Sequence, residues 1–265
     1  MSITGVSEAP TDNELIQFAH DLADAARPVV MALFRTRLDV EAKADESPVT
    51  IADRNAEAAM RVLIEKTFPD HGIIGEEHGK QNEDAEYVWV LDPIDGTKSF
   101  VTGKPLFGIL IALMKNGKPI LGVIDMPALG ERFIGVNGTA TMNGDAVAVR
   151  GAKDLKDAWL YTTTPDMFDT DERRAAYGRL AADVRQALFG CDCYAYGLLA
   201  SGHVDLVCEA NMSLYDFAAL VPVVEGAGGV ITDWQGAALG PSSDGTVLAA
   251  ATPALHKMAL DRLRG

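Results

Sequence analysis

Three Asn-Gly pairs, at residues 116–117, 137–138 and 143–144, constrain the fold of this chain more than any other feature of its sequence. A two-residue hairpin turn of the common type needs positive φ angles at both central positions, and Asn and Gly tolerate these best. Apolar runs at residues 106–114 and 119–125 flank the first pair. The pairs therefore predict tight turns between antiparallel strands in the first half of the chain.

Two helices are expected ahead of this sheet. Thr11 and Glu14 have the spacing of a capping box, and apolar residues then recur at three- and four-residue intervals. Pro28 lies inside that pattern and is expected to kink or interrupt the first helix. A second helix is expected to start near Thr50 and to stop at residues 69–72.

Strand and helix patterns alternate in the second half of the chain. Strands are expected at residues 159–163, 204–208, 230–232 and 247–251, and helices at residues 171–187, 194–200, 215–225 and 253–263. This alternation predicts an α/β lobe. The expected fold class is therefore α+β with an α/β second lobe. Residues 1–150 would hold the helices, the antiparallel sheet and most metal ligands, and residues 151–265 the α/β lobe.

The charge of the chain limits its partners. It carries 23 Lys and Arg against 38 Asp and Glu, a formal net charge of −15. Repulsion from phosphates argues against a nucleic-acid binder and against docking on an anionic membrane. No stretch approaches the ~18 apolar residues of a membrane span. Without a signal-peptide pattern at the first residues, a cytoplasmic protein is expected. The three cysteines, at 191, 193 and 208, are expected to be reduced thiols.

The chemistry of the chain is concentrated after an apolar run at residues 87–91, which ends in Asp92-Pro-Ile-Asp-Gly-Thr97. Two carboxylates held this close repel each other unless a cation or a proton lies between them. Mg²⁺ is a natural partner, because it prefers oxygen ligands and also binds substrate phosphate. A capped turn at the end of a strand is the alternative interpretation of such a motif taken alone.

Other acids favour the metal site over the capped turn. Glu76 and Glu77 follow a short apolar strand, and Asp53 lies near the start of the second expected helix. Asp216 opens a largely apolar helix. Taken singly, Asp53 would stabilise a helix dipole and Asp216 would cap a helix.

These motifs, in this order, resemble the inositol monophosphatase superfamily of Mg²⁺-dependent, lithium-sensitive phosphatases. The resemblance covers residues 15–263 and extends through Gly75-Glu-Glu77, the Asp92–Thr97 motif, Tyr215-Asp216 and residues 225–229. Family members commonly have Trp where this chain has Tyr215. The resemblance implies a layered αβαβα sandwich of the sugar-phosphatase type and a homodimer.

The resemblance also implies the ligands of two or three Mg²⁺ ions in each active site. The first ion would be held by Glu76, Asp92 and the carbonyl of Ile94. The second would be held by Asp92, Asp95 and Asp216. Glu76 with waters would hold a weaker third ion.

The remaining implied roles concern the substrate and the attacking water. Gly96 and Thr97 would donate hydrogen bonds to the phosphate, and Lys43 matches a loop lysine near the site. A metal-activated water would attack, activated through Thr97 with Asp53. Asp53, Glu76 and Thr97 would thus be the catalytic residues.

The local sequence at residues 190–197 and 205–216 looks most like the histidinol-phosphatase branch. The implied reaction is hydrolysis of L-histidinol phosphate to L-histidinol and phosphate, a step of histidine biosynthesis. The substrate carries an ammonium and an imidazole, with which Asp192, Glu209 and Asn211 could pair.

Several alternatives stay open at this point. Asp192 and Glu209 could be solvated loop acids. Glu209 could equally bind a polyol hydroxyl, as in an inositol-1-monophosphatase, and a broad-specificity sugar or nucleotide phosphatase of the same superfamily is a further alternative. Tyr194 and Tyr196 could stack on an imidazole, although their spacing on a helix predicts that at least one is packed. A non-catalytic, metal-dependent binding protein is the alternative from another functional class.

Overall fold

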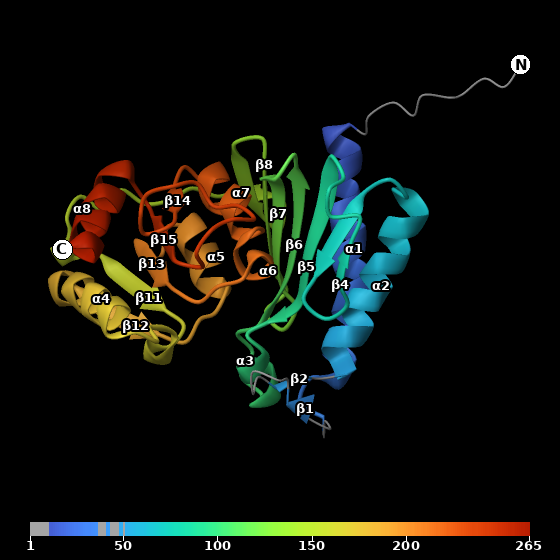
Figure 1. Cartoon of the computed structure of the whole chain (residues 1–265), viewed down its shortest axis with the longest axis horizontal. Helices are drawn as coiled ribbons and strands as arrows, with labels where there is room; N and C mark the ends of the chain where they lie inside the picture. Colours follow the sequence, from blue (N-terminus) through green and yellow to red (C-terminus); the bar gives the residue numbers. More distant parts are fainter. Residues whose placement is uncertain (1–10, 37–40, 43–47, 50) are drawn as a thin grey trace, which may run out of the picture.

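The computed structural model describes residues 11–36, 41–42, 48–49 and 51–265 of the chain, the two short pieces by their backbone alone. Its elements stack in five layers, helix, sheet, helix, sheet and helix, which confirms the expected sandwich (Figure 1). The first layer is α1 (Asp12–Leu33) and α2 (Ile51–Thr67). The middle layer is α5 (Tyr194–Ala200), α6 (Leu214–Phe217) and α7 (Leu220–Gly226). The last layer is α4 (Asp171–Asp183) and α8 (Pro253–Arg264).

The first sheet has eight strands in the order β10-β9-β8-β7-β6-β5-β3-β4. They are β3 (Gly72–Gly75), β4 (Gly79–Gln81), β5 (Tyr87–Asp95), β6 (Gly108–Lys115), β7 (Lys118–Met126), β8 (Glu131–Val136), β9 (Thr139–Met142) and β10 (Asp145–Ala146). All three Asn-Gly pairs have positive φ at both residues, and they form the turns β6–β7, β8–β9 and β9–β10 between antiparallel strands, as predicted. Residues 127–130 connect β7 to β8, which completes the meander from β6 to β10. One pair of neighbouring strands departs from the antiparallel expectation, since β3 and β5 are parallel. After β3 the chain forms the antiparallel edge strand β4, and it then crosses to the other side of β3 to form β5.

The second sheet has five strands in the order β12-β11-β13-β15-β14. They are β11 (Trp159–Thr162), β12 (Gln186–Phe189), β13 (Leu206–Glu209), β14 (Val230–Thr232) and β15 (Val247–Ala250). Two 3-10 turns, η1 (Leu155–Asp157) and η2 (Pro165–Met167), flank β11. A separate short ladder pairs β1 (Glu41–Ala42) with β2 (Pro48–Val49). In the described part of the chain, none of the helices has the length and apolar character that crossing a bilayer requires.

Two helical expectations differ from the structure. The helix expected to reach residue 187 ends at Asp183, because Val184 is extended and residues 186–189 form the edge strand β12. The single helix expected at residues 215–225 is divided into α6 and α7. Pro222 falls in the first turn of α7, where its missing N–H would have had no partner inside the helix.

The first helix is not interrupted at Pro28, since α1 continues through it to Leu33. A proline in a helix removes one backbone hydrogen bond. The buried residues Ala26 and Val30 lie on either side of Pro28 and pack in the core between the helices and the first sheet. This burial holds the last turns of the helix against the sheet.

Two glycines allow the middle helical layer to approach the first sheet closely. A Cβ on Gly122 of β7 would lie 2.0 Å from the carbonyl oxygen of Ala219, and one on Gly135 of β8 would lie 2.1 Å from that of Pro222. The backbone around α7 therefore rests directly on the sheet. The same approach brings α6, which precedes α7, against β5 and β6. This contact decides where Asp216 lies.

Candidate metal centre

Three of the predicted acids meet at the end of β5. Oxygen atoms of Asp92, Asp95 and Asp216 all lie within 4.8 Å of one another. Asp92 and Asp95 belong to β5, which continues to Asp95 instead of ending before the motif, and Asp216 belongs to α6. The register of β5 against β6 shifts between Asp92 and Asp95. Without this bulge, residues three apart on a strand would point to opposite faces.

A backbone N–H orients each of the three carboxylates. Ile94 N donates to Asp92 Oδ1 at 3.0 Å, and Cys193 N donates to Asp95 Oδ2 at 2.7 Å. Ser213 N donates to Asp216 Oδ2 at 2.7 Å as half of a capping box. The three groups are therefore held in place by the turns and helix ends around them.

Burial and mutual repulsion make this cluster unfavourable as a set of free anions. Asp92 is 1% exposed, and its pKa lies well above the usual range because of burial and then the charges of Glu76, Asp95, Asp216 and Asp53. Burial, followed by the charges of Asp192 and Asp216, likewise raises the pKa of Asp95. The site must therefore take up protons or a cation. A donor set made of carboxylate oxygens suits a hard divalent cation such as Mg²⁺.

In the metal-free protein, the raised pKa of Asp92 predicts a stability that falls as the pH rises. Above the ordinary carboxyl pKa of 3.8, the unfolded chain loses a proton that the folded protein retains, so the free energy of unfolding decreases until the pH passes the raised folded-state pKa. We expect the chelated protein to melt at a lower temperature at about pH 8 than at about pH 5, and Mg²⁺ to reverse this loss. Calorimetry of the wild type and of Asp92→Asn tests this, and an equal pH dependence in both proteins would contradict it.

Glu76 and Asp53 approach the cluster from two other elements. Glu76 follows β3, and its backbone N donates to the carbonyl of Leu91 at 3.2 Å. Asp53 lies in the first turn of α2 and is 2% exposed. Both are near enough for their charges to raise the pKa of Asp92. Glu76 and Asp53 therefore lie near Asp92, beside the three acids whose oxygen atoms converge within 4.8 Å.

The residues after Asp95 form a tight turn into α3 (Thr97–Val101). Gly96 precedes this helix with a φ of 82°, a conformation that favours glycine. Thr97 Oγ1 donates to the carbonyl oxygen of Ile94 at 3.1 Å, so a predicted hydroxyl and a predicted carbonyl ligand are in contact. Lys43 lies outside the described residues.

Asp192 lies beside this turn and is half-buried. Ser99 Oγ donates to Asp192 Oδ2 at 2.8 Å, and a Cβ on Gly96 would lie 3.0 Å from the same carboxylate. Burial raises the pKa of Asp192, although Ser99, Lys104 and Lys98 lower it in part. Asp192 thus links α3 and the turn before it to the start of α5.

Glu209 ends β13 and is 3% exposed, so it is not a solvated loop acid. Its carboxylate accepts hydrogen bonds from Thr163 N at 3.0 Å, Thr163 Oγ1 at 2.6 Å and Tyr196 Oη at 2.8 Å. Burial raises the pKa of Glu209, and the charge of Asp192 adds to this increase. Tyr196 is fully buried, which confirms that at least one of the two helical tyrosines is packed.

Asn211 is turned toward a different part of the second lobe. Its amide donates to the carbonyl oxygen of Met167 at 2.9 Å and accepts from the guanidinium of Arg173. Its backbone φ of 59° is left-handed, which Asn tolerates. The structure therefore brings Asp192 and Glu209 toward the acid cluster, whereas the Asn211 side chain is engaged with α4 and η2.

Some residues that hold the site together were not predicted from sequence. Ser213 could have been predicted from its spacing of three residues from Asp216, since the two form a capping box. Ser99 bonds a residue 93 positions away, and Thr163 bonds one 46 positions away. No local pattern connects such pairs.

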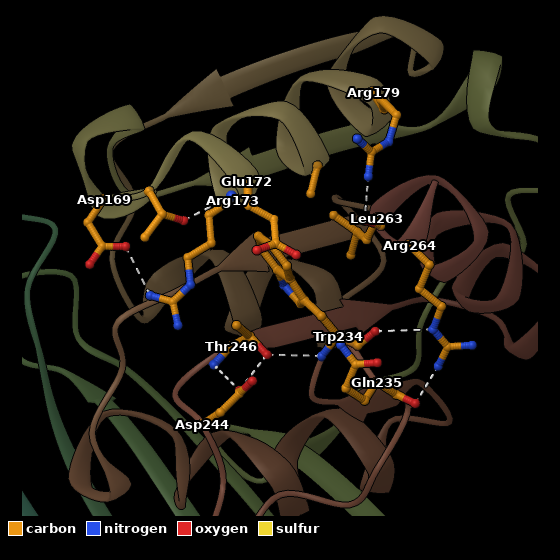
Figure 2. A pocket seen from close by; sticks show the side chains of 12 residues that line it. Asp169, Glu172, Arg173, Arg179, Trp234, Gln235, Asp244, Thr246, Leu263 and Arg264 are labelled. Atoms are coloured by element: carbon orange, nitrogen blue, oxygen red, sulfur yellow. Dashed lines mark hydrogen bonds and ion pairs between the residues drawn. The ribbon is translucent and has the colours of Figure 1, made fainter.

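A separate cavity of about 650 Å³ lies between α4, α8 and the segment after β14 (Figure 2). The three arginines that line it bond an acid or nearby carbonyl groups. Arg173 pairs with Asp169 at 3.1 Å, and Arg179 donates to the Leu263 carbonyl at 2.7 Å. Arg264 donates to the Trp234 carbonyl at 3.4 Å. None of the three clustered acids lines this cavity, so it is distinct from the metal centre.

Comparison with known proteins identifies relatives over nearly the whole chain. The sequence profile of the inositol monophosphatase family matches residues 11–264. The bifunctional phosphatase IMPL2, chloroplastic, of Arabidopsis thaliana is 50% identical over 97% of this chain and 79% of its own. A histidinol-phosphatase of Chlorobaculum parvum is 39% identical over 83% of this chain and 86% of its own. The solved structure of an inositol monophosphatase from Zymomonas mobilis superimposes with a TM-score of 0.89 at 44% identity, covering 97% of this chain and all of the other.

Proposed function

The chain belongs to the inositol monophosphatase family and is a phosphoric monoester hydrolase, and from this premise we propose that its substrate is L-histidinol phosphate. The products would be L-histidinol and phosphate, in histidine biosynthesis. The convergence of Asp92, Asp95 and Asp216 within 4.8 Å is the observation that supports the hydrolytic chemistry. A phosphate ester could enter such an acidic site only together with cations.

The proposed metal ligands follow from the donor set. Asp92, Asp95 and Asp216 would hold one Mg²⁺, and Glu76, Asp92 and the Ile94 carbonyl a second, with a weaker third on Glu76. Bound Mg²⁺ would stabilise the phosphoryl charge and lower the pKa of a water molecule. The raised pKa of Asp92 supports this assignment, because a carboxylate in such a place is stabilised by a cation.

The chain's own residues would orient the phosphate and handle the proton. Gly96 and Thr97, at the turn into α3, would donate hydrogen bonds to the phosphate oxygens. Thr97 and Asp53 would take the proton of the attacking water. For this, the Thr97 hydroxyl would exchange its bond to the Ile94 carbonyl for one to Asp53.

The substrate assignment rests on the histidinol-phosphatase relatives and on two acids beside the cluster. The charges of Asp192 and Glu209 interact, and Asp192 also lies near Asp95. Two neighbouring carboxylates would pair with the ammonium and imidazole of histidinol phosphate by charge-assisted hydrogen bonds. An inositol monophosphatase is the second candidate, because of the similar Zymomonas mobilis structure. A broad-specificity phosphatase of the family is a third.

A phosphatase panel tests this proposal. The protein is assayed for phosphate release from L-histidinol phosphate, inositol 1-phosphate, fructose 1,6-bisphosphate and adenosine 3′,5′-bisphosphate, each with Mg²⁺ and with EDTA. We expect activity only with Mg²⁺. The kcat/KM should be about tenfold or more higher for histidinol phosphate, since a charged hydrogen bond contributes about 1.5–3 kcal/mol. An equal or higher kcat/KM for any of the other three esters would contradict the substrate assignment. No release from any ester would instead favour a binding protein.

We also propose a homodimer in the cytoplasm. The dimer rests on the family resemblance, and light scattering should give twice the 28.2 kDa chain mass. The compartment is supported by Cys191, Cys193 and Cys208, which are buried free thiols as expected.

A further inference from the structure

Helix α2 carries a second buried acid, Glu57, which the proposed mechanism does not use. Its side chain is 0% exposed, one turn after Asp53 on the same helix. A buried carboxylate is costly unless hydrogen-bond donors surround it. The donors around Glu57 therefore indicate what it does.

Two of these donors are backbone groups of the turn that carries Glu76. This turn, residues 76–78, connects β3 to β4. Glu77 N donates to Glu57 Oε2 at 2.7 Å, and His78 N donates to Glu57 Oε1 at 3.2 Å. The carboxylate thus binds the two peptide groups that directly follow Glu76.

Arg61 holds Glu57 in this position. Arg61 Nε donates to Glu57 Oε1 at 2.7 Å, one helical turn away, and its Nη2 donates to the carbonyl of Gly79. The same turn is tied to α2 again, because His78 Nε2 lies 3.0 Å from the carbonyl oxygen of Arg54. Residues 77–79, directly after Glu76, are therefore connected to this helix.

Gly75 makes the contact possible from the strand side. A Cβ at this position would lie 2.0 Å from Glu57 Oε1 and 2.3 Å from its Cδ. The φ of Gly75 is not positive, so the need for glycine here is one of space. The Glu57 carboxylate occupies the volume that any side chain at residue 75 would require.

We propose that Glu57 is a positioning residue that sets the place of Glu76 in the metal site. Glu76 is bound on one side through its own N–H to the Leu91 carbonyl, next to Asp92, and on the other side through the turn that Glu57 holds. This inference rests on the proposed role of Glu76 as a Mg²⁺ ligand. Groups that orient a metal ligand typically change metal affinity by about 10- to 100-fold when removed.

Mg²⁺ binding to Glu57→Gln tests the proposal. An amide has only one acceptor oxygen, so its NH₂ group would face at least one of the three donors. Isothermal titration calorimetry should show Mg²⁺ binding about tenfold or more weaker, and the Mg²⁺ concentration for half-maximal phosphatase activity should rise by a similar factor. The substrate KM at saturating Mg²⁺ should stay near that of the wild type, since Glu57 does not reach the substrate site. Glu65→Gln, an exposed acid on the same helix, is the matched control and should behave as wild type.

Gly75→Ala provides an independent variant, because its Cβ displaces the same carboxylate from the other side. It should weaken Mg²⁺ binding in the same direction, and it decides the question if Glu57→Gln does not fold. If either variant folds and its Mg²⁺ affinity is within about twofold of that of the wild type, the proposal is overturned, because the expected change is much larger. A wild type that neither binds Mg²⁺ nor releases phosphate would instead refute the proposed function.

Discussion

Replacing Asp95 by Asn should lower kcat by about a thousandfold or more, because the site loses several kcal/mol of metal-dependent transition-state stabilisation. Asp95 is one of the three acids that meet within 4.8 Å. The Asn carbonyl oxygen can still accept the hydrogen bond from Cys193 N, so the local backbone should keep its position. Phosphate release with Mg²⁺, assayed on histidinol phosphate, measures the loss.

The same variant should fold at least as stably as the wild type when Mg²⁺ is removed. A neutral amide relieves the repulsion that Asp192 and Asp216 exert on Asp95. The melting temperature in EDTA would therefore show whether the variant has lost only its activity or also its folded structure. Asp84→Asn, a change of an exposed acid, should alter neither property. An Asp95→Asn protein with nearly wild-type kcat would refute the metal assignment.

Replacing Asp125 by Ala should reduce the free energy of unfolding by about 3–5 kcal/mol, the usual cost of breaking a buried ion pair. Asp125 lies on β7 with its side chain 0% exposed. It accepts hydrogen bonds from Arg27 Nε at 3.0 Å and from Arg132 Nε at 2.7 Å. It therefore connects α1 to β7 and β8, and its loss leaves Arg132, 9% exposed, without its buried counter-charge.

Asp24→Ala is the matched control for this prediction. Asp24 also pairs with Arg132, at 2.6 Å, but its side chain is 67% exposed. Exposed pairs contribute about 0–1 kcal/mol, so its removal should change stability little. Urea unfolding of both variants gives the comparison. Equal losses in the two proteins would show that burial of Asp125 does not decide the energy.

Local signals predicted much of the fold, because turn and capping chemistry acts over a few residues. The Thr11–Glu14 capping box is present, and the Asn-Gly pairs form three of the turns of the first sheet. Signals that depend on neighbours were less reliable. The edge strand β12 looked like the end of a helix, since its pairing with β11 is not visible in its own sequence.

The sequence by itself determined most helices and strands, the family motifs and the identity of the acids around the site, since each is recorded in short motifs and periodicities. The five-layer architecture followed from the resemblance that those motifs carry. Only the tertiary structure decided how the acids meet. The bulge in β5 turns Asp92 and Asp95 to one point, and the close approach of α7 to the sheet brings Asp216 there. The tertiary structure also showed that Glu209 is buried beside Asp192, whereas Asn211 is bound to Arg173. The physical reason is that hydrogen bonds and burial depend on partners distant in the chain, such as Glu57 with the turn after Gly75, and no local pattern records them.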